Sequence, residues 1–268
     1  MKNTSTIVLL VILLVGLSLL LYPTVSNYWN SFRQTRAIGS YMELVSNIDI
    51  EEYNRILNSA RDYNQKNKDR KLWSLTDEER ELYNKELNLD GNGIMGYINI
   101  PAVNCTLPIY HGTSDSVLQI AIGHLENSSL PVGGESTHCV VSGHRGLPSA
   151  LLFTNLDQLI VGDVFELHVL DELLTYEVDQ IRIVDPEDIT ELTIEEGSDL
   201  CTMITCTPYG VNSHRLLVRG HRVENRIVSD VRVSADALQI DDTIVTIGIF
   251  VIIFTFSLGW LFISYRRR

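Results

Sequence analysis

Cysteine is scarce in this chain of 268 residues and occurs only as Cys105, Cys139, Cys201 and Cys206. Their spacings match neither the paired pattern of structural zinc sites nor a disulfide-dense scaffold, and no metal or cofactor is predicted. An even count would still allow two disulfides outside a cell. Because a domain of this size can bury a core without cross-links, we interpret the first three cysteines as small buried hydrophobic residues. Cys206 is the exception.

Basic residues are also few relative to acidic residues. The chain has 21 Lys and Arg against 34 Asp and Glu, which gives a formal net charge of −13, and no stretch gathers basic residues into a stripe. Nucleic-acid-binding proteins usually carry such a stripe, so nucleic acid is not an expected partner. No internal repeat or low-complexity segment is evident either.

Charge is absent altogether from a long run at each end of the chain. As helices, residues 6–22 would span about 25 Å and residues 243–263 about 31 Å, close to the roughly 30 Å hydrocarbon core of a bilayer. Arg266, Arg267 and Arg268 follow the second run, and the positive-inside rule keeps them cytoplasmic. We expect both termini inside and the intervening residues outside the cell. Cleavage of the first run as a signal peptide is the alternative.

Helical periodicity continues through the polar residues 27–90. Apolar residues recur at helical spacing between Tyr53 and Tyr63. Thr76 and Glu79 form a capping-box pattern, which predicts a helix that runs to about Leu87.

From residue 94 onward, short β-branched runs alternate with turn residues. Seven runs are predicted to be strands: Gly96–Ile100, Leu107–Tyr110, Cys139–Ser142, Val164–Leu170, Leu174–Val184, Leu200–Thr205 and Leu216–Arg222. Residues 118–122 and 149–156 are predicted to be short helical turns. Many short strands at modest spacing are typical of an all-β barrel or sandwich.

One pair of predicted strands brings a thiol near a cation. Cys206 ends the first strand and precedes turn residues, and Arg215 begins the next strand. Adjacent strand ends meet at one mouth of a sheet, so the two side chains can meet there. A nucleophilic cysteine needs a stabilised thiolate, and a guanidinium can hold a substrate carbonyl or an oxyanion. A buried packing role for Cys206 and a surface ion pair for Arg215 are the alternatives.

A histidine completes the set of groups that acyl transfer through a thioester requires. His144 follows the predicted strand that ends at Ser142, and the glycines beside it let backbone and substrate approach closely. His124 is the second choice. Each of the seven histidines could instead be structural.

These motifs resemble those of the class C, pilin-polymerising sortases of Gram-positive bacteria, over residues from about Gly96 to Arg222. The T-L-x-T-C signature of that family is present as Thr202 to Cys206, with Met203 in place of leucine. The other matching stretches are Met95–Pro101, Leu107–Thr113, Gly123–Glu126, Ser129–Gly134, Ser142–Pro148 and Tyr176–Ile181.

The resemblance implies an all-β fold, a closed eight-stranded β-barrel with its active site at one rim. It implies Cys206 as the nucleophile, His144 as the proton donor and acceptor, and Arg215 as the ligand of substrate and oxyanion. His124 then has a structural role. The residues around the nucleophile are expected to bind substrate: Thr205, Thr207, Pro208 and Tyr209.

Class C sortases often carry a lid before the barrel, in which an Asp-Pro-aromatic triplet plugs the site. No such triplet occurs in this chain. Asp69 and the pair Leu72 and Trp73 are the nearest equivalents, so a lid would be built from roughly residues 64–75. A plain packing role for Trp73 is the alternative.

The expected organisation combines the membrane segments with the barrel. Its parts are a cytoplasmic end (1–5), a transmembrane helix or signal anchor (6–22), an extracellular helical extension with the lid (23–90), the catalytic barrel (91–225), a spacer (226–242), a second transmembrane helix (243–263) and a basic cytoplasmic tail (264–268).

The resemblance implies a membrane-anchored cysteine transpeptidase. It would cleave LPxTG-like sorting signals of secreted pilin subunits and join each subunit to a lysine of another pilin, with membrane lipid as a further partner. Two transmembrane segments and the helical extension favour this function over the anchoring of surface proteins to peptidoglycan. A non-catalytic, membrane-tethered binding module is the alternative from another class.

Overall fold

The computed structural model describes residues 2–68, 75–225, 253–254 and 257. The spacer, most of the second apolar run and the basic tail therefore lie outside the described residues, as does the centre of the proposed lid. The contact pattern divides the chain into one unit ending at Arg226 and a second one beginning at Ile227.

The N-terminal part is helical, as its periodicity predicts. Helix α1 (Lys2–Asn47) contains the first apolar run and is long and apolar enough to cross a membrane by length and composition. Helix α2 (Ile50–Asn67) follows after a short break. Helix α3 (Asp77–Tyr83) opens with the predicted capping box, in which the Thr76 hydroxyl accepts the Glu79 N–H. It ends four residues earlier than expected.

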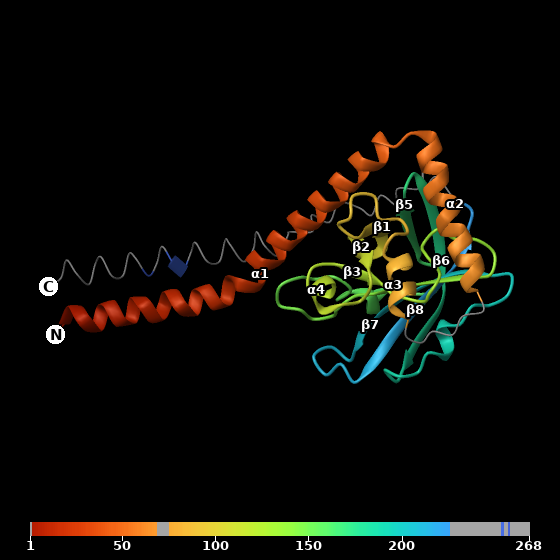
Figure 1. Ribbon diagram of the computed structural model, residues 1–268. Coiled ribbons are helices and arrows are strands. Elements are labelled where there is room, and N and C mark those ends of the chain that lie inside the picture. The colour runs from red at the N-terminus through yellow and green to blue at the C-terminus, as the bar shows by residue number, and fades with distance from the viewer. Residues whose placement is uncertain (1, 69–74, 226–252, 255–256, 258–268) are drawn as a thin grey trace. The chain divides into compact units, whose positions relative to one another are not determined.

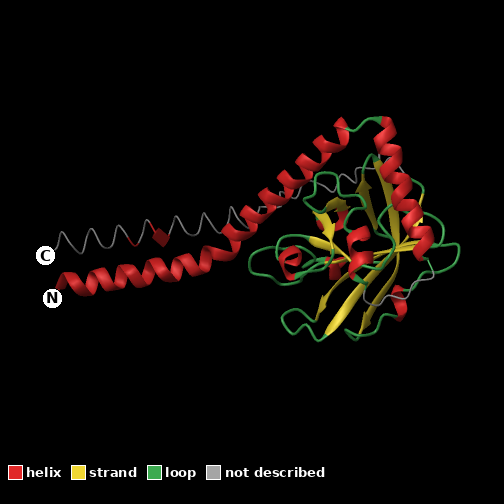
Figure 2. Ribbon diagram, viewed as in Figure 1, coloured by secondary structure: helices red, strands yellow, loops and turns green. Residues whose placement is uncertain are grey.

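The rest of the first unit is a closed eight-stranded barrel with short helices, which confirms the predicted fold (Figures 1 and 2). The ring order is β1-β2-β3-β4-β7-β8-β6-β5. The strands are β1 (Ile94–Ile100), β2 (Cys105–His111), β3 (Ile122–His124), β4 (Thr137–Ser142), β5 (Val164–Val169), β6 (Glu172–Val184), β7 (Asp199–Thr207) and β8 (His214–Val223). The short helices are η1 (Pro101–Val103), α4 (Asp115–Leu118), η2 (Leu156–Gln158) and η3 (Thr190–Leu192).

Strand β3 is the one strand that the sequence pattern did not predict. The segment 118–122, interpreted as a helical turn, is helical only at Leu118, the last residue of α4, and its final residue Ile122 begins β3. The strand is held between β2 and β4 by very close packing. A Cβ atom on Gly123 would lie 2.0 Å from the carbonyl oxygen of Gly112. A three-residue strand with a central glycine leaves no alternation for a sequence pattern to detect.

Strand alternation separates an inner and an outer face of the barrel wall. Cys201 and Met203 of β7 belong to the interior core, with Cys139 of β4, so these two cysteines are buried as predicted. Ile204, the residue after Met203, packs on the outer face, in a separate cluster with Leu192 of η3.

The two ends of the barrel are used differently. Residues of α2 and α3, including Leu57 and Tyr83, pack with Met95 and Leu170 in a second core. Met95 lies at the start of β1 and Leu170 just after the end of β5, so this core closes one end. Strands β4 and β7 are parallel, and both terminate at the opposite end. That opposite end carries the predicted site.

Candidate active site

Cys206 and Arg215 are direct partners across the β7–β8 ladder. Leu216, next to Arg215, belongs to the interior core, and Leu217 belongs to the outer cluster. Since side chains alternate along a strand, Arg215 shares the outer face with Leu217, and Cys206 shares it with Ile204. Both Cys206 and Arg215 are half-buried. The thiol therefore lies on the outside of the barrel wall, at its rim, and is not enclosed in the core.

The segment carrying His144 is bonded directly to this end of β7. The Gly143 N–H donates to the Ile204 carbonyl at 3.0 Å, and the Thr205 hydroxyl donates to the Gly143 carbonyl at 2.8 Å. Parallel pairing of β4 with β7 places His144 just past the rim, beside Cys206. The backbone positions of the three predicted residues thus meet at one barrel rim, where the end of β4 lies beside the ends of β7 and β8 that one loop joins.

The glycine before His144 has a packing role, and its expected role in substrate approach stays a prediction. A Cβ atom on Gly143 would lie 2.7 Å from the Phe153 ring and 2.8 Å from the Ile122 side chain. Gly146 has a positive φ, and the ring of Tyr209 packs against it. A Cβ atom on Gly146 would lie 2.9 Å from that ring. The glycines therefore let the His144 loop lie tightly against the barrel and against the β7–β8 loop.

Arg145 is a residue of the site that the sequence did not reveal. Its side chain is only 9% exposed and forms an ion pair with Asp157 of η2. One guanidinium nitrogen lies 3.4 Å from the Thr207 hydroxyl, and the guanidinium carbon lies 5.8 Å from the centre of the Tyr209 ring. Arg145 therefore ties the residue after His144 to the residue after Cys206. Only its position beside His144 could have signalled this role.

Removing the Arg145 side chain should lower the rate of peptide cleavage without abolishing it. We expect Arg145→Ala to reduce kcat by about tenfold, because a loosened His144 loop misplaces the proton donor. Asp157→Asn should reproduce part of the loss, and the double variant should lose less than the product of the single effects because the two residues act as a pair. Steady-state kinetics of the four proteins measure this. Fully multiplicative losses would contradict a shared role.

The chain resembles known proteins both in sequence and in structure. A sortase-domain family model matches residues 98–223. Sortase C1 of Streptococcus agalactiae is 55% identical with a TM-score of 0.70, over 71% of this chain and 100% of that chain. Sortase C of Streptococcus pneumoniae is 43% identical with a TM-score of 0.63, over 70% of this chain and 96% of that one. The chain belongs to the sortase family.

The class C assignment made from the motifs is confirmed by these solved structures. Among curated sequences, sortase D of Bacillus subtilis (strain 168) is 31% identical over 131 residues. That alignment covers 48% of this chain and 63% of that protein, so the chain spans less than two thirds of this relative.

The residues expected to bind the sortase substrate have different surroundings. Thr205 and Thr207 are buried, and their hydroxyls contact the His144 loop. Pro208 is exposed, and Tyr209 is 61% exposed at the rim beside the site. Contact with substrate stays a prediction for all four residues. Pro208 and Tyr209 are better placed for it than the two threonines, because their side chains are exposed.

The proposed lid residues Asp69, Leu72 and Trp73 lie outside the described residues, so this expectation stays a prediction. The residues that flank them do have neighbours. The Asn64 side chain exchanges hydrogen bonds with the backbone of Leu130 at 2.7 and 3.1 Å, and Leu75 is buried in the second core. Both flanks are therefore anchored at the end of the barrel opposite Cys206.

None of the other three thiols of the sortase combines a low pKa with access to substrate. The hydrogen bond with Cys201 lowers the pKa of Cys139, but the Cys139 side chain is only 2% exposed, inside the barrel. Burial raises the pKa of Cys105 to about 12. Cys139 and Cys201 are ladder partners inside the barrel, and burial together with the hydrogen bond to Cys139 raises the pKa of Cys201 well above the usual range. Cys206, by contrast, is half-buried on the outer face of the rim, where a substrate can reach it.

His124 has the structural role that the resemblance implied. It is fully buried, its Nε2 donates to the Ser129 carbonyl at 2.9 Å, and its Nδ1 accepts the Tyr83 hydroxyl at 2.9 Å. These bonds attach α3 to β3, at the end of the barrel opposite Cys206.

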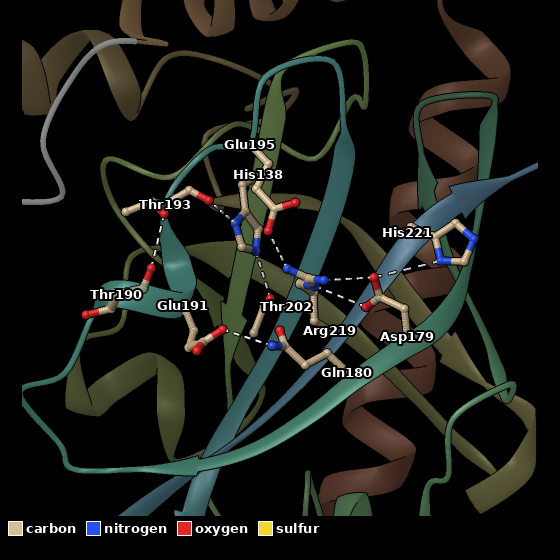
Figure 3. A network of polar contacts seen from close by, with 10 residues as sticks. All are labelled: His138, Asp179, Gln180, Thr190, Glu191, Thr193, Glu195, Thr202, Arg219 and His221. Atoms are coloured by element: carbon tan, nitrogen blue, oxygen red, sulfur yellow. Dashed lines mark hydrogen bonds and ion pairs between the residues drawn. The ribbon is translucent and has the colours of Figure 1, made fainter.

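A polar network on the outer wall fastens the loop between β6 and β7 (Figure 3). Arg219 makes two bonds to Asp179, at 3.0 and 3.1 Å, and a third at 2.5 Å to Glu195 of the loop. His138 Nδ1 donates to the Thr193 carbonyl of the loop at 2.8 Å, so its Nε2 accepts the Thr202 hydroxyl at 2.7 Å when the ring is neutral. The loop starts at the barrel end that carries Cys206, where Val184 pairs with Arg215.

This network should make stability depend on pH. Burial lowers the pKa of His138 below its usual value. The charge of Arg219 acts in the same direction, whereas the carboxylates of Glu195 and Asp179 oppose the shift. Its stabilising contribution is complete above the unfolded pKa of about 6.5 and is lost as pH falls below that value, because the unfolded chain then binds the proton more readily. We expect the melting temperature of the wild type to fall more between about pH 7 and pH 5.5 than that of His138→Asn. The difference between the two falls should be about a few degrees.

Thermal unfolding in detergent at constant ionic strength provides the measurement. His221→Asn is the matched control, because His221 belongs to the same network but is half exposed, and it should keep the wild-type slope. Parallel slopes for the wild type and His138→Asn would show that His138 is not the titrating group.

Proposed function

We propose that this sortase is a membrane-anchored cysteine transpeptidase that joins pilin subunits through lysine isopeptide bonds. The observation that supports the proposal is that Cys206, Arg215 and the backbone segment carrying His144 lie at one barrel rim. The pilin substrate is supported by the similar S. pneumoniae sortase C, whose structure is described as informing pilin substrate specificity.

In the proposed reaction, the Cys206 thiolate attacks the carbonyl between Thr and Gly of an LPxTG-like signal. The C–S bond forms as the carbonyl π electrons move onto oxygen, where the Arg215 guanidinium stabilises the negative charge. Collapse of this intermediate breaks the C–N bond, and protonated His144 gives its proton to the departing glycine amine. A thioester at Cys206 remains.

The second half of the reaction runs through the same groups. A lysine amine of another subunit attacks the thioester and loses a proton to neutral His144. Collapse releases the Cys206 thiolate and leaves an amide between threonine and the lysine Nζ. Arg215 serves both tetrahedral intermediates, because each places an oxyanion at the same carbonyl carbon.

The ligation products test this proposal. The full chain, in detergent micelles, is given a sorting-signal peptide with two competing amines: a folded pilin domain carrying surface lysines, and a short peptide whose only amine is its N-terminal α-amine. We expect mass spectrometry to find threonine joined to a lysine Nζ. A product formed only on the α-amine would favour peptidoglycan anchoring. Absence of any cleavage would overturn the transpeptidase proposal.

A further inference from the structure

Beyond the apolar run, α1 has a face that binds the barrel. The Asn27 side chain accepts the Leu151 N–H at 2.9 Å, the Asn30 side chain donates to the Ser149 carbonyl at 2.8 Å, and Gln34 donates to the Ile120 carbonyl at 2.6 Å. Ile38 and Tyr41 continue this face and are buried. Spacings of three and four residues place all five on one side of a helix. Two of these bonds hold the loop that leads from His144 to η2.

The opposite side of the same segment is apolar and uncovered. Tyr22, Val25, Trp29 and Phe32, termed here the aromatic stripe, also recur at three- and four-residue spacing and are 57%, 63%, 60% and 54% exposed. Tyr28 lies beside the stripe and is 69% exposed. A contiguous patch of large apolar side chains rarely faces water without a partner.

The charge of the segment identifies that partner. Between residues 3 and 42 the only charged residues are Arg33 and Arg36, although the whole chain has a net charge of −13. Aromatic residues next to a membrane-spanning run, followed by arginines, are the composition that favours the headgroup zone of a bilayer. A basic, aromatic surface in an otherwise acidic protein fits anionic lipid.

We propose that the aromatic stripe is embedded in the outer headgroup region of the membrane, so that α1 runs along the bilayer surface after it leaves the hydrocarbon core. A helix continuing straight along the bilayer normal would carry Phe32 about 15 Å beyond Tyr22, past a headgroup layer that is roughly 5–7 Å deep. Pro23 lies at the junction, where its missing N–H permits a bend in the helix.

This arrangement sets the height of the active site. The barrel is bonded to the face of α1 that points away from the lipid, so the loop after His144 is held about one helix diameter, roughly 10–12 Å, from the membrane surface. If the proposed function is correct, this placement favours substrates that are themselves held at the membrane.

Lipid contact is tested by the fluorescence of Trp29. The chain has three tryptophans, so a Trp73→Phe, Trp260→Phe background leaves Trp29 alone. The full chain is placed in vesicles containing anionic lipid, with or without phospholipids brominated near the headgroup. We expect bromine to quench roughly half of the emission, because the side chain is embedded in that layer.

The matched control moves the probe to the barrel side of the chain. Ile183 of β6, on the barrel wall away from the strands β1 and β2 that α1 contacts, is 64% exposed, and Ile183→Trp in the same background with Trp29→Phe should not be quenched. Blue-shifted but unquenched Trp29 emission would show that protein, such as a second copy of the chain, covers the stripe. Red-shifted, unquenched emission would show that water does. Either result overturns the proposal.

Activity provides a second, separable readout. We expect Trp29→Ser with Phe32→Ser to lower kcat/KM about tenfold for a sorting-signal peptide tethered to vesicle lipid, because the local concentration advantage is lost. Activity on the same peptide free in solution should not change, and Trp29→Tyr should retain the wild-type ratio. Equal losses on both peptides would overturn the membrane role. Failure of the wild type on both would refute the proposed function and leave the quenching result standing.

Discussion

Cys206→Ala should reduce peptide cleavage and pilin joining to the uncatalysed background, a loss of at least about 10⁴-fold. Without the sulfur no thioester can form, and the remaining donors cannot supply the missing nucleophile. Because Cys206 is half-buried on the outer face of the rim, its truncation removes little core volume, and the fold should be retained. Measured cleavage rates and melting temperatures together test this prediction.

Cys105→Ala is the matched control for that loss. Cys105 is also half-buried, but it packs against the interior core and its sulfur donates to the Leu152 carbonyl at 3.7 Å. Its removal should affect stability and leave the cleavage rate within a few fold of the wild type. Substantial activity in Cys206→Ala would assign the chemistry to another residue.

Arg215→Ala should lower kcat by about 10²–10³-fold with a smaller change in KM, since an oxyanion donor acts mainly in the transition state. The guanidinium now donates only weakly within its own loop, to the carbonyls of Asn212 at 3.3 Å and His214 at 3.1 Å. These contacts can be exchanged for a substrate oxygen at little cost. Arg215→Lys keeps the charge but lacks the planar fork, so it should recover only part of the rate.

Arg61→Ala controls for the general effect of removing a positive charge. Arg61 is exposed on α2, which packs at the end of the barrel away from Cys206, and its loss should not change kcat. If Arg215→Ala affected KM alone, Arg215 would be a ground-state substrate ligand and not an oxyanion donor.

Some elements of the fold could be predicted from the sequence and others could not. Seven strands could be predicted because each has an apolar run bounded by turn residues. β3 could not, because its three residues have no periodicity and depend on the close approach of Gly123 to Gly112. The capping box of α3 was predicted because Thr76 and Glu79 are local to one turn.

Contacts between distant segments were the part that sequence could not supply. Arg145 and Asp157 are both ordinary charged residues until the η2 turn brings them together. The same holds for Arg219, which lies on the same outer face as Arg215 but is fully engaged with Asp179 and Glu195. Sequence position favoured Arg215 because it begins its strand opposite Cys206, but it did not reveal the carboxylate partners that hold Arg219.

Trapping the thioester tests the account most directly. The full chain is mixed with a sorting-signal peptide in the absence of any acceptor amine, quenched in acid and digested for mass spectrometry. We expect the acyl group, cut after threonine, on the sulfur of Cys206, and no adduct in the His144→Ala protein at the same time point. An adduct on Cys105, Cys139 or Cys201, or cleavage without any acylated sulfur, would contradict it.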